Sequence, residues 1–279
     1  MYSGFITSKR AIAAVGVHQR FDTVAYRIVE SYFAASTFPS LAQIIHFEGV
    51  NGPDGLKVKS PGKNETSHLY NPLTDTGPVP EYIEQHYKGL VAALKQHDMV
   101  RAAFEAAWMA HYICDGMTPA HHFPLDEHLE KHELVKTPKG RYRLRQPGEP
   151  ARATVKKSWA VWGGKGLLTT HFNFEMGVAA ALIGQRIRVR LDVAKLVEAR
   201  QMGITEFFKQ EARDIAELQM YERFYDKGWN TELARQVKVK LAPQTVQLIA
   251  IAWLLAYLET GQEVLEKDLQ QAKEQEVEL

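Results

Sequence analysis

The segment Trp108–His122 reads WMAHYICDGMTPAHH, and the interpretation of the whole chain starts from it. His111 and Asp115 lie four residues apart, so both side chains project from one face if the segment is a helix. A glycine and a proline then end the helix, and His121 follows within one loop turn. A His/Asp pair with a third ligand nearby can bind one metal ion or two adjacent ions.

Pairs of a histidine and an acid at this spacing recur along the chain. With 33 Asp and Glu among 279 residues, the 11 histidines would give roughly one such pair by chance. Four occur: His18–Asp22, His111–Asp115, His122–Asp126 and His171–Glu175. Solvated or locally hydrogen-bonded pairs on helix surfaces have the same spacing, so the spacing alone does not establish a metal site.

The composition excludes several classes of protein. Hydrophobic residues make up 45% of the chain, which excludes a disordered protein. The formal net charge is +1, so no global basic excess indicates a nucleic-acid binder. A single cysteine, Cys114, excludes an intramolecular disulfide and therefore a disulfide-rich secreted scaffold.

No segment has the length and composition of a transmembrane helix. The longest apolar run, Leu248–Leu258, spans eleven residues, about half of what a bilayer requires. The first residues show no signal peptide, so the sequence predicts a cytoplasmic protein. If the N-terminus is incomplete, we expect a secreted or periplasmic protein instead.

Apolar residues recur at helical spacing along most of the chain, so we expect an all-α helical bundle formed by a single domain over residues 1–279. A loop rich in proline and glycine is expected over 47–80. Pro243 should kink or break the helix that contains it. The predicted helices cover 8–35, 81–95, 99–113, 172–184, 192–202, 205–225, 230–256 and 261–274.

Residues 122–170 differ from the rest and are expected to form an irregular insertion. They contain four prolines and a Gly-Gly pair, and residues 131–165 hold ten Lys or Arg against two Glu. This basic segment predicts a surface for an anionic ligand. Its aromatic residues Tyr142, Trp159 and Trp162 could stack on bases or lie at a lipid interface. A solvated loop with a few packed aromatic residues fits the same composition.

Taken in order, the motifs resemble those of the zinc-dependent phospholipase C and S1/P1 nuclease superfamily. His111–His121 (HYICDGMTPAH) is similar to the superfamily's helix-ending His-x-x-x-Asp signature, which a histidine follows six residues later. Ser67–Pro72 (SHLYNP) is similar to its Ser-His-Phe-Tyr-Asp-Pro loop. Asp54 precedes His68 by fourteen residues, the spacing of the superfamily's catalytic Asp. His18 matches its early helical histidine, and HFNFE matches its last His-x-x-x-Glu.

This resemblance implies a zinc cluster held by an all-α fold. Each of two zinc ions would be bound by two histidines and one carboxylate: His68, His111 and Asp115 for the first ion, and His121, His171 and Glu175 for the second.

The resemblance also implies a third zinc, to which His18 and a bridging Asp115 would contribute. The superfamily completes this site with an N-terminal Trp, whereas Phe5 stands at the matching distance before His18 here. The third site would therefore be empty, weak, or completed by another group such as Asp22.

The activity implied by the resemblance is zinc-dependent hydrolysis of phosphoric esters by a metal-activated water, with Asp54 orienting or deprotonating that water. Glu175 and the SHLYNP loop favour a phospholipase C-like phosphodiesterase, with a phosphoester and possible phospholipid substrate. The basic segment favours an S1/P1-like nuclease instead. A third alternative is a non-catalytic zinc-binding protein of the same fold. The oligomeric state is left open.

The remaining histidines carry weaker signals. His46, His86 and His97 lie outside the motifs and are expected on the surface or in loops. His122, His128 and His132 fit an additional metal site or a charged helical face, and His128 and His132 are also four residues apart.

Overall fold

The computed structural model describes residues 16–55, 68–136 and 142–261. Within these ranges the regular secondary structure is helical apart from one short strand pair, which confirms the all-α fold class. The α-helices are α1 (Val17–Val29), α2 (Leu41–His46), α4 (Val79–Lys95), α5 (Met99–Gly116), α6 (Pro119–His122), α7 (Leu125–Lys131), α8 (Ala151–Trp162), α9 (Leu167–Leu182), α10 (Val193–Met202), α11 (Ile204–Ala216), α12 (Met220–Lys227), α13 (Thr231–Gln236) and α14 (Ala242–Leu258).

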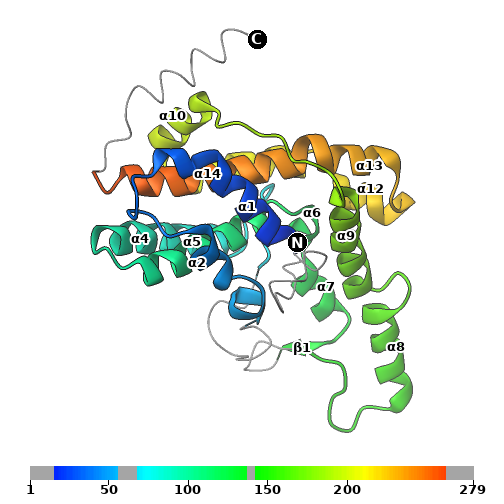
Figure 1. The fold of residues 1–279 in the computed structure, drawn as a ribbon. Helices are drawn as coiled ribbons and strands as arrows, with labels where there is room; N and C mark the ends of the chain where they lie inside the picture. Colours follow the sequence, from blue (N-terminus) through cyan, green and yellow to red (C-terminus); the bar gives the residue numbers. More distant parts are fainter. Residues whose placement is uncertain (1–15, 56–67, 137–141, 262–279) are drawn as a thin grey trace.

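Helix α14 runs between α10 on one side and the paired helices α4 and α5 on the other (Figure 1). It is apolar on all sides, the pattern of a helix that is buried all round. Helix α1 packs along it, and the paired helices α4 and α5 also contact it. Trp253 of α14 is fully buried, and its indole N–H donates to the carbonyl oxygen of Ala106 on α5 at 3.1 Å. This packing holds α1 and α5 beside each other.

One helical stretch, Thr231–Leu258, is long and apolar enough by length and composition to cross a membrane. In the fold, 78% of its most apolar window is buried inside the protein. The core helix of a soluble protein meets the same test, so this stretch is weak support for a membrane span.

The junction between α5 and α6 is tightly packed. A Cβ atom at Gly116 would lie 2.4 Å from Cζ of Phe208, so only glycine lets the end of α5 approach α11 this closely. The hydroxyl of Thr118 donates to the carbonyl oxygen of Cys114 at 2.7 Å. A proline then starts α6. The short turn places His121 just beyond the last turn of α5.

Several predicted helices agree with the structure. The predictions over 81–95, 99–113 and 192–202 differ from α4, α5 and α10 by no more than three residues at either end. For the first predicted helix, α1 and the 3₁₀ turn Glu30–Tyr32 cover residues 17–32, and the prediction is wrong for 33–35, while 8–15 lies outside the described residues. The last predicted helix also lies outside them from residue 262 onward.

One predicted helix is divided in the structure, and another contains a π-helical turn. The prediction over 205–225 spans both α11 and α12, which are separated at Gln219, where the backbone φ is +48°. The helix predicted over 230–256 contains a π-helical turn, Val237–Leu241, which ends two residues before Pro243. Proline has no backbone N–H to donate to the carbonyl four residues earlier, and its ring clashes with that carbonyl. A widened turn relieves the clash.

The segment expected to be irregular is partly regular. Helices α7 and α8 flank a two-residue antiparallel strand pair, β1 (Val135–Lys136) and β2 (Tyr142–Arg143). A small apolar cluster of Leu125, Leu129, Leu134 and Val161 holds these elements together. The prediction is wrong for Ala151–Trp162, where helix-compatible residues follow Pro150 and end at Gly163.

Candidate metal centre

All eight side chains predicted for the site come from six separate segments. Helix α1 supplies His18, α5 supplies His111 and Asp115, and α9 supplies His171 and Glu175. Helix α6 supplies His121, and the segments around residues 54 and 68 supply Asp54 and His68. The backbone N–H of Tyr70 donates to the carbonyl oxygen of His121 at 3.0 Å, which ties the segment of His68 to α6.

Asp115 is the point on which the histidines converge. Its Oδ2 lies 2.7 Å from Nδ1 of His68 and 3.1 Å from Nε2 of His111. Its Oδ1 lies 3.4 Å from Nε2 of His18 and 3.7 Å from Nε2 of His121. One buried carboxylate with histidines on both oxygens is suited to bridge two metal ions.

Among the residues that the structure describes, three groups of side chains have ligand atoms close enough together to hold a metal ion. The atoms within each group lie within 4.8 Å of one another. The groups are His18, His111 and Asp115; Asp54, His68 and His111; and His121, His171 and Glu175.

Unsatisfied buried nitrogens support metal binding here. Both ring nitrogens of His18 are buried and lack a hydrogen-bond partner within the part of the chain that the structure describes. The same holds for Nδ1 of His171. Leaving buried polar atoms unpaired is costly, and a metal ion would satisfy an imidazole nitrogen that no hydrogen bond satisfies.

The third group, around Glu175, is more open to solvent than the first group. Oε1 of Glu175 lies 2.9 Å from Nε2 of His121 and 3.2 Å from Nε2 of His171. Nδ1–H of His121 donates to the carbonyl oxygen of His68 at 2.8 Å. That bond fixes the tautomer of His121. Its Nε2, which faces Glu175, is then the nitrogen that can bind a metal ion.

Glu48 is a buried residue of the centre that sequence reasoning missed. Its Oε2 lies 3.3 Å from Nδ1 of His111, and its side chain has no exposed surface. By accepting that hydrogen bond it orients the opposite nitrogen, Nε2, toward Asp115. Nothing in the sequence around residue 48 marks it, because it forms no His-x-x-x-Glu pair.

Neighbouring charges shift the pKa values of His111 and Asp115 in the direction opposite to the effect of burial. Burial alone would lower the pKa of His111, but Asp115 and Glu48 raise it well above its usual value. Burial alone would raise the pKa of Asp115, but neighbouring positive charge, including His121 and His111, holds it well below its usual range. A metal ion that binds His111 must therefore displace a firmly held proton.

Asp22 is also buried beside this centre, one helical turn after His18. Both of its carboxylate oxygens lack a hydrogen-bond partner within residues 16–55, 68–136 and 142–261. Burial and the nearby charge of Glu48 raise its pKa well above the usual value. It is close to the centre but outside the three candidate groups.

The histidines outside the centre differ in their burial and contacts. His46 and His97 are exposed, as predicted. The prediction for His86 is wrong, because its ring is 2% exposed and its Nδ1 pairs with the buried carboxylate of Glu105. The ring of His128 lies against that of Phe123 with the two planes tilted by 33° and, like His132, belongs to none of the candidate metal groups among the described residues.

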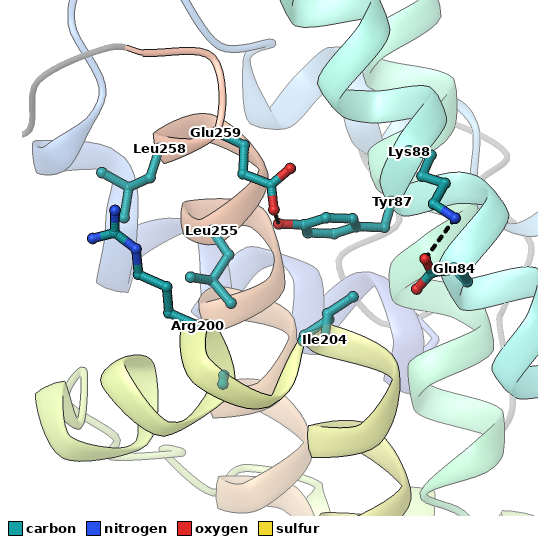
Figure 2. Close-up of a pocket in the computed structure, with 10 residues that line it drawn as sticks. Glu84, Tyr87, Lys88, Arg200, Ile204, Leu255, Leu258 and Glu259 are labelled. Carbon is teal, nitrogen blue, oxygen red and sulfur yellow. Dashed lines mark hydrogen bonds and ion pairs between the residues drawn. The ribbon is translucent and has the colours of Figure 1, made fainter.

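A separate cavity of about 410 Å³ lies between α4, the end of α10, the start of α11 and the end of α14 (Figure 2). Figure 2 shows Tyr87 reaching Glu259, to which its phenol donates at 2.6 Å, and Lys88 paired with Glu84 at 2.8 Å. None of the residues that line it is a candidate metal ligand. The candidate chemistry therefore belongs to the metal centre and not to this cavity.

Neither the models of known protein families nor the curated protein sequences give a match to this chain. The superfamily assignment therefore stays a prediction from the sequence motifs.

Proposed function

We propose that this protein is a metal-dependent hydrolase of phosphoric esters, specifically a phospholipase C-like phosphodiesterase of the zinc-dependent phospholipase C and S1/P1 nuclease type. The observation that carries the proposal is the convergence on Asp115 of histidines from four separate segments. Asp54 stands beside them at the solvent-exposed edge. A bundle with no metal chemistry would have little reason to bury so many titratable groups together.

The proposed reaction needs both the ligands and an accessible acid–base group. Bound divalent ions would stabilise charge on the phosphoryl oxygens and lower the pKa of bound water toward neutrality. The side chain of Asp54 is 39% exposed, and its Oδ1 lies 3.6 Å from Nδ1 of His68. It is therefore accessible to a substrate, and we assign it the orientation or deprotonation of the attacking water.

We propose zinc as the metal because imidazoles and carboxylates form the mixed nitrogen and oxygen shell that zinc accepts. Two ions would use the ligand sets that the motifs imply. A third would use His18 and Asp115, and buried Asp22 is the nearest additional carboxylate on the same helix.

An S1/P1-like nuclease is the second candidate. It is favoured by the exposed tryptophans Trp159 and Trp162 and by the cations around them, since both contribute to nucleic-acid binding. The two candidates share the metal chemistry and differ in the substrate that is cleaved.

The first experiment combines elemental analysis with hydrolysis of chromogenic phosphodiesters before and after chelation. We expect two or three zinc ions per chain in the parent protein and loss of hydrolysis on chelation. Asp54→Asn should keep its metal and lose activity, whereas His111→Ala should lose both. His97→Ala is the matched control, because His97 is exposed and outside the centre.

Two results would overturn the proposal. If protein purified without chelators contains no metal, the proposed zinc cluster does not exist. Zinc without hydrolysis of lipid, nucleic-acid or small phosphodiesters would identify a non-catalytic zinc-binding protein. Hydrolysis of nucleic acid alone would favour the nuclease.

A further inference from the structure

We propose that the exposed face of α8 is a docking surface for an anionic phospholipid membrane. The surface consists of Val155, Trp159 and Trp162 with the cations Arg152 and Lys156 at its side, and it is called the α8 face below. The inference goes beyond the proposed function, because it requires neither bound metal nor hydrolysis.

The apolar residues of the α8 face are unusually exposed. Trp159 is 75% exposed, Val155 is 67% exposed and Trp162 is 57% exposed. Their spacing of four and three residues puts all three on one side of the helix. Exposed apolar side chains scattered singly need no explanation, but two tryptophans and a valine in one helical row mark an interaction site.

The opposite side of α8 attaches the helix to the protein. Val161 is 1% exposed and belongs to the small apolar cluster beneath the helix. Lys157 is also buried, and its ammonium group pairs with Glu149 at 2.6 Å. Since these contacts hold α8 in place, the tryptophans cannot turn inward by a simple rotation of the helix. Figure 1 shows α8 at the edge of the molecule, far from α14.

The charge of the surface is uniformly positive. Arg152, Lys156 and Lys165 are exposed, and none has an ion-pair partner in the ranges that the structure describes. No Asp or Glu occurs in the sequence from 150 to 174. Tryptophan beside lysine and arginine on one side of a helix is the composition of an interfacial helix that binds anionic lipid.

A membrane fits the α8 face better than a nucleic acid does. Single-stranded nucleic acid is bound by aromatic rings that stack on bases, and Val155 offers no ring. Helix α9, which contacts α8, also carries exposed Phe172 and Met176, whose aromatic and aliphatic surfaces suit acyl chains. Tryptophan is the residue most typical of the membrane–water boundary.

The test is sedimentation of the full chain with phosphatidylcholine vesicles that contain or lack phosphatidylserine. We expect binding to the anionic vesicles, weaker binding at higher salt, and quenching of tryptophan fluorescence by lipids brominated on the acyl chain. Trp159→Ala combined with Trp162→Ala should weaken binding by about tenfold or more, because the anchoring rings are removed. Lys156→Glu should weaken binding only where phosphatidylserine is present.

Two controls separate this inference from the proposed function. His111→Ala should bind vesicles like the parent protein while losing metal, and the double tryptophan variant should cleave a small soluble phosphodiester like the parent protein. Val100→Ala removes an apolar side chain that is 65% exposed on α5 and should leave vesicle binding unchanged. Circular dichroism checks that each variant keeps its helix content.

Unchanged vesicle binding by the double tryptophan variant would overturn the proposal, as would the absence of binding by the parent protein. Binding of single-stranded DNA that the same variant loses, without vesicle binding, would assign the α8 face to nucleic acid instead.

Discussion

The two halves of the candidate metal centre differ in how far water can reach them. The inner half comprises His18, His68, His111 and Asp115, whose side chains are at most 3% exposed. The outer half comprises His121, His171 and Glu175, and two of these side chains are about 15% exposed. An enclosed site keeps its metal and supports the fold, whereas an open site can admit substrate. We therefore expect the inner half to hold the centre together and the outer half to exchange ligands.

The largest loss of hydrolysis is expected from replacing Asp115, because its carboxylate faces histidines of both halves. Asp115→Asn keeps the shape of the side chain but removes the charge that faces the surrounding histidines. Loss of a residue that only orients a ligand costs about 10–100-fold, so loss of this shared ligand should lower phosphodiester hydrolysis by about 10³-fold or more. Metal content per chain and turnover of a chromogenic phosphodiester measure it. Asp214→Asn, at an exposed position on α11, is the control and should match the parent protein.

A smaller effect is expected from the outer half alone. Glu175→Gln should release the outer ion, retain the inner metal and lower hydrolysis by about 10²-fold. Timed chelation followed by elemental analysis should show one ion already missing and the remainder leaving slowly. If all the metal leaves together, the two halves are not independent and the comparison fails.

A still smaller effect is expected from replacing Glu48, which contacts His111 of the inner half. Glu48→Gln retains an oxygen that can accept from Nδ1 of His111 but removes the negative charge. We expect about tenfold weaker metal affinity, at the low end for a residue that orients a ligand, with near-parent hydrolysis at saturating metal. A competition titration against a coloured chelator measures the affinity. Exposed Glu217→Gln is the control, and a loss of hydrolysis that excess metal cannot restore would place Glu48 in the chemistry itself.

The outer half was the easier part to predict from sequence. His171 and Glu175 lie on one helix, so their four-residue spacing directly implies that their side chains are neighbours. His111 and Asp115 carry the same local signal on α5. The order of these motifs along the chain then singled out Asp54, His68 and His18, which the structure brings to the same place.

Contacts between distant segments account for what the sequence did not reveal. Glu48 meets His111 across 63 positions, and no pattern near either residue indicates that they meet. His86 looked like a surface histidine because burial and pairing with Glu105 depend on how α4 packs on α5. In the fold, the helical period was sufficient for α4 and α5. The break at Gln219 depends on a left-handed backbone position that the period does not encode.

The smallest expected effect is a difference in the pH at which the two halves bind metal. Burial lowers the pKa of His171, so its imidazole loses its proton at a lower pH than an ordinary histidine does. Asp115 and Glu48 raise the pKa of His111 well above 6.5 despite its burial, so it keeps its proton to higher pH. In metal-free protein, that proton contributes stability that is complete below pH 6.5 and is lost as the pH rises through the raised pKa.

Because only the unprotonated imidazole binds metal, the outer half should load zinc at lower pH than the inner half. Metal-free protein titrated with zinc at a series of pH values should therefore show two loading steps. His171→Gln should abolish the step at lower pH and leave the other unchanged, since His171 lies outside the inner ligand set. Loading of both halves at one pH would mean that the carboxylates around His111 do not hold its proton. The exposure of the two halves, and not their proton affinity, would then be the remaining difference between them.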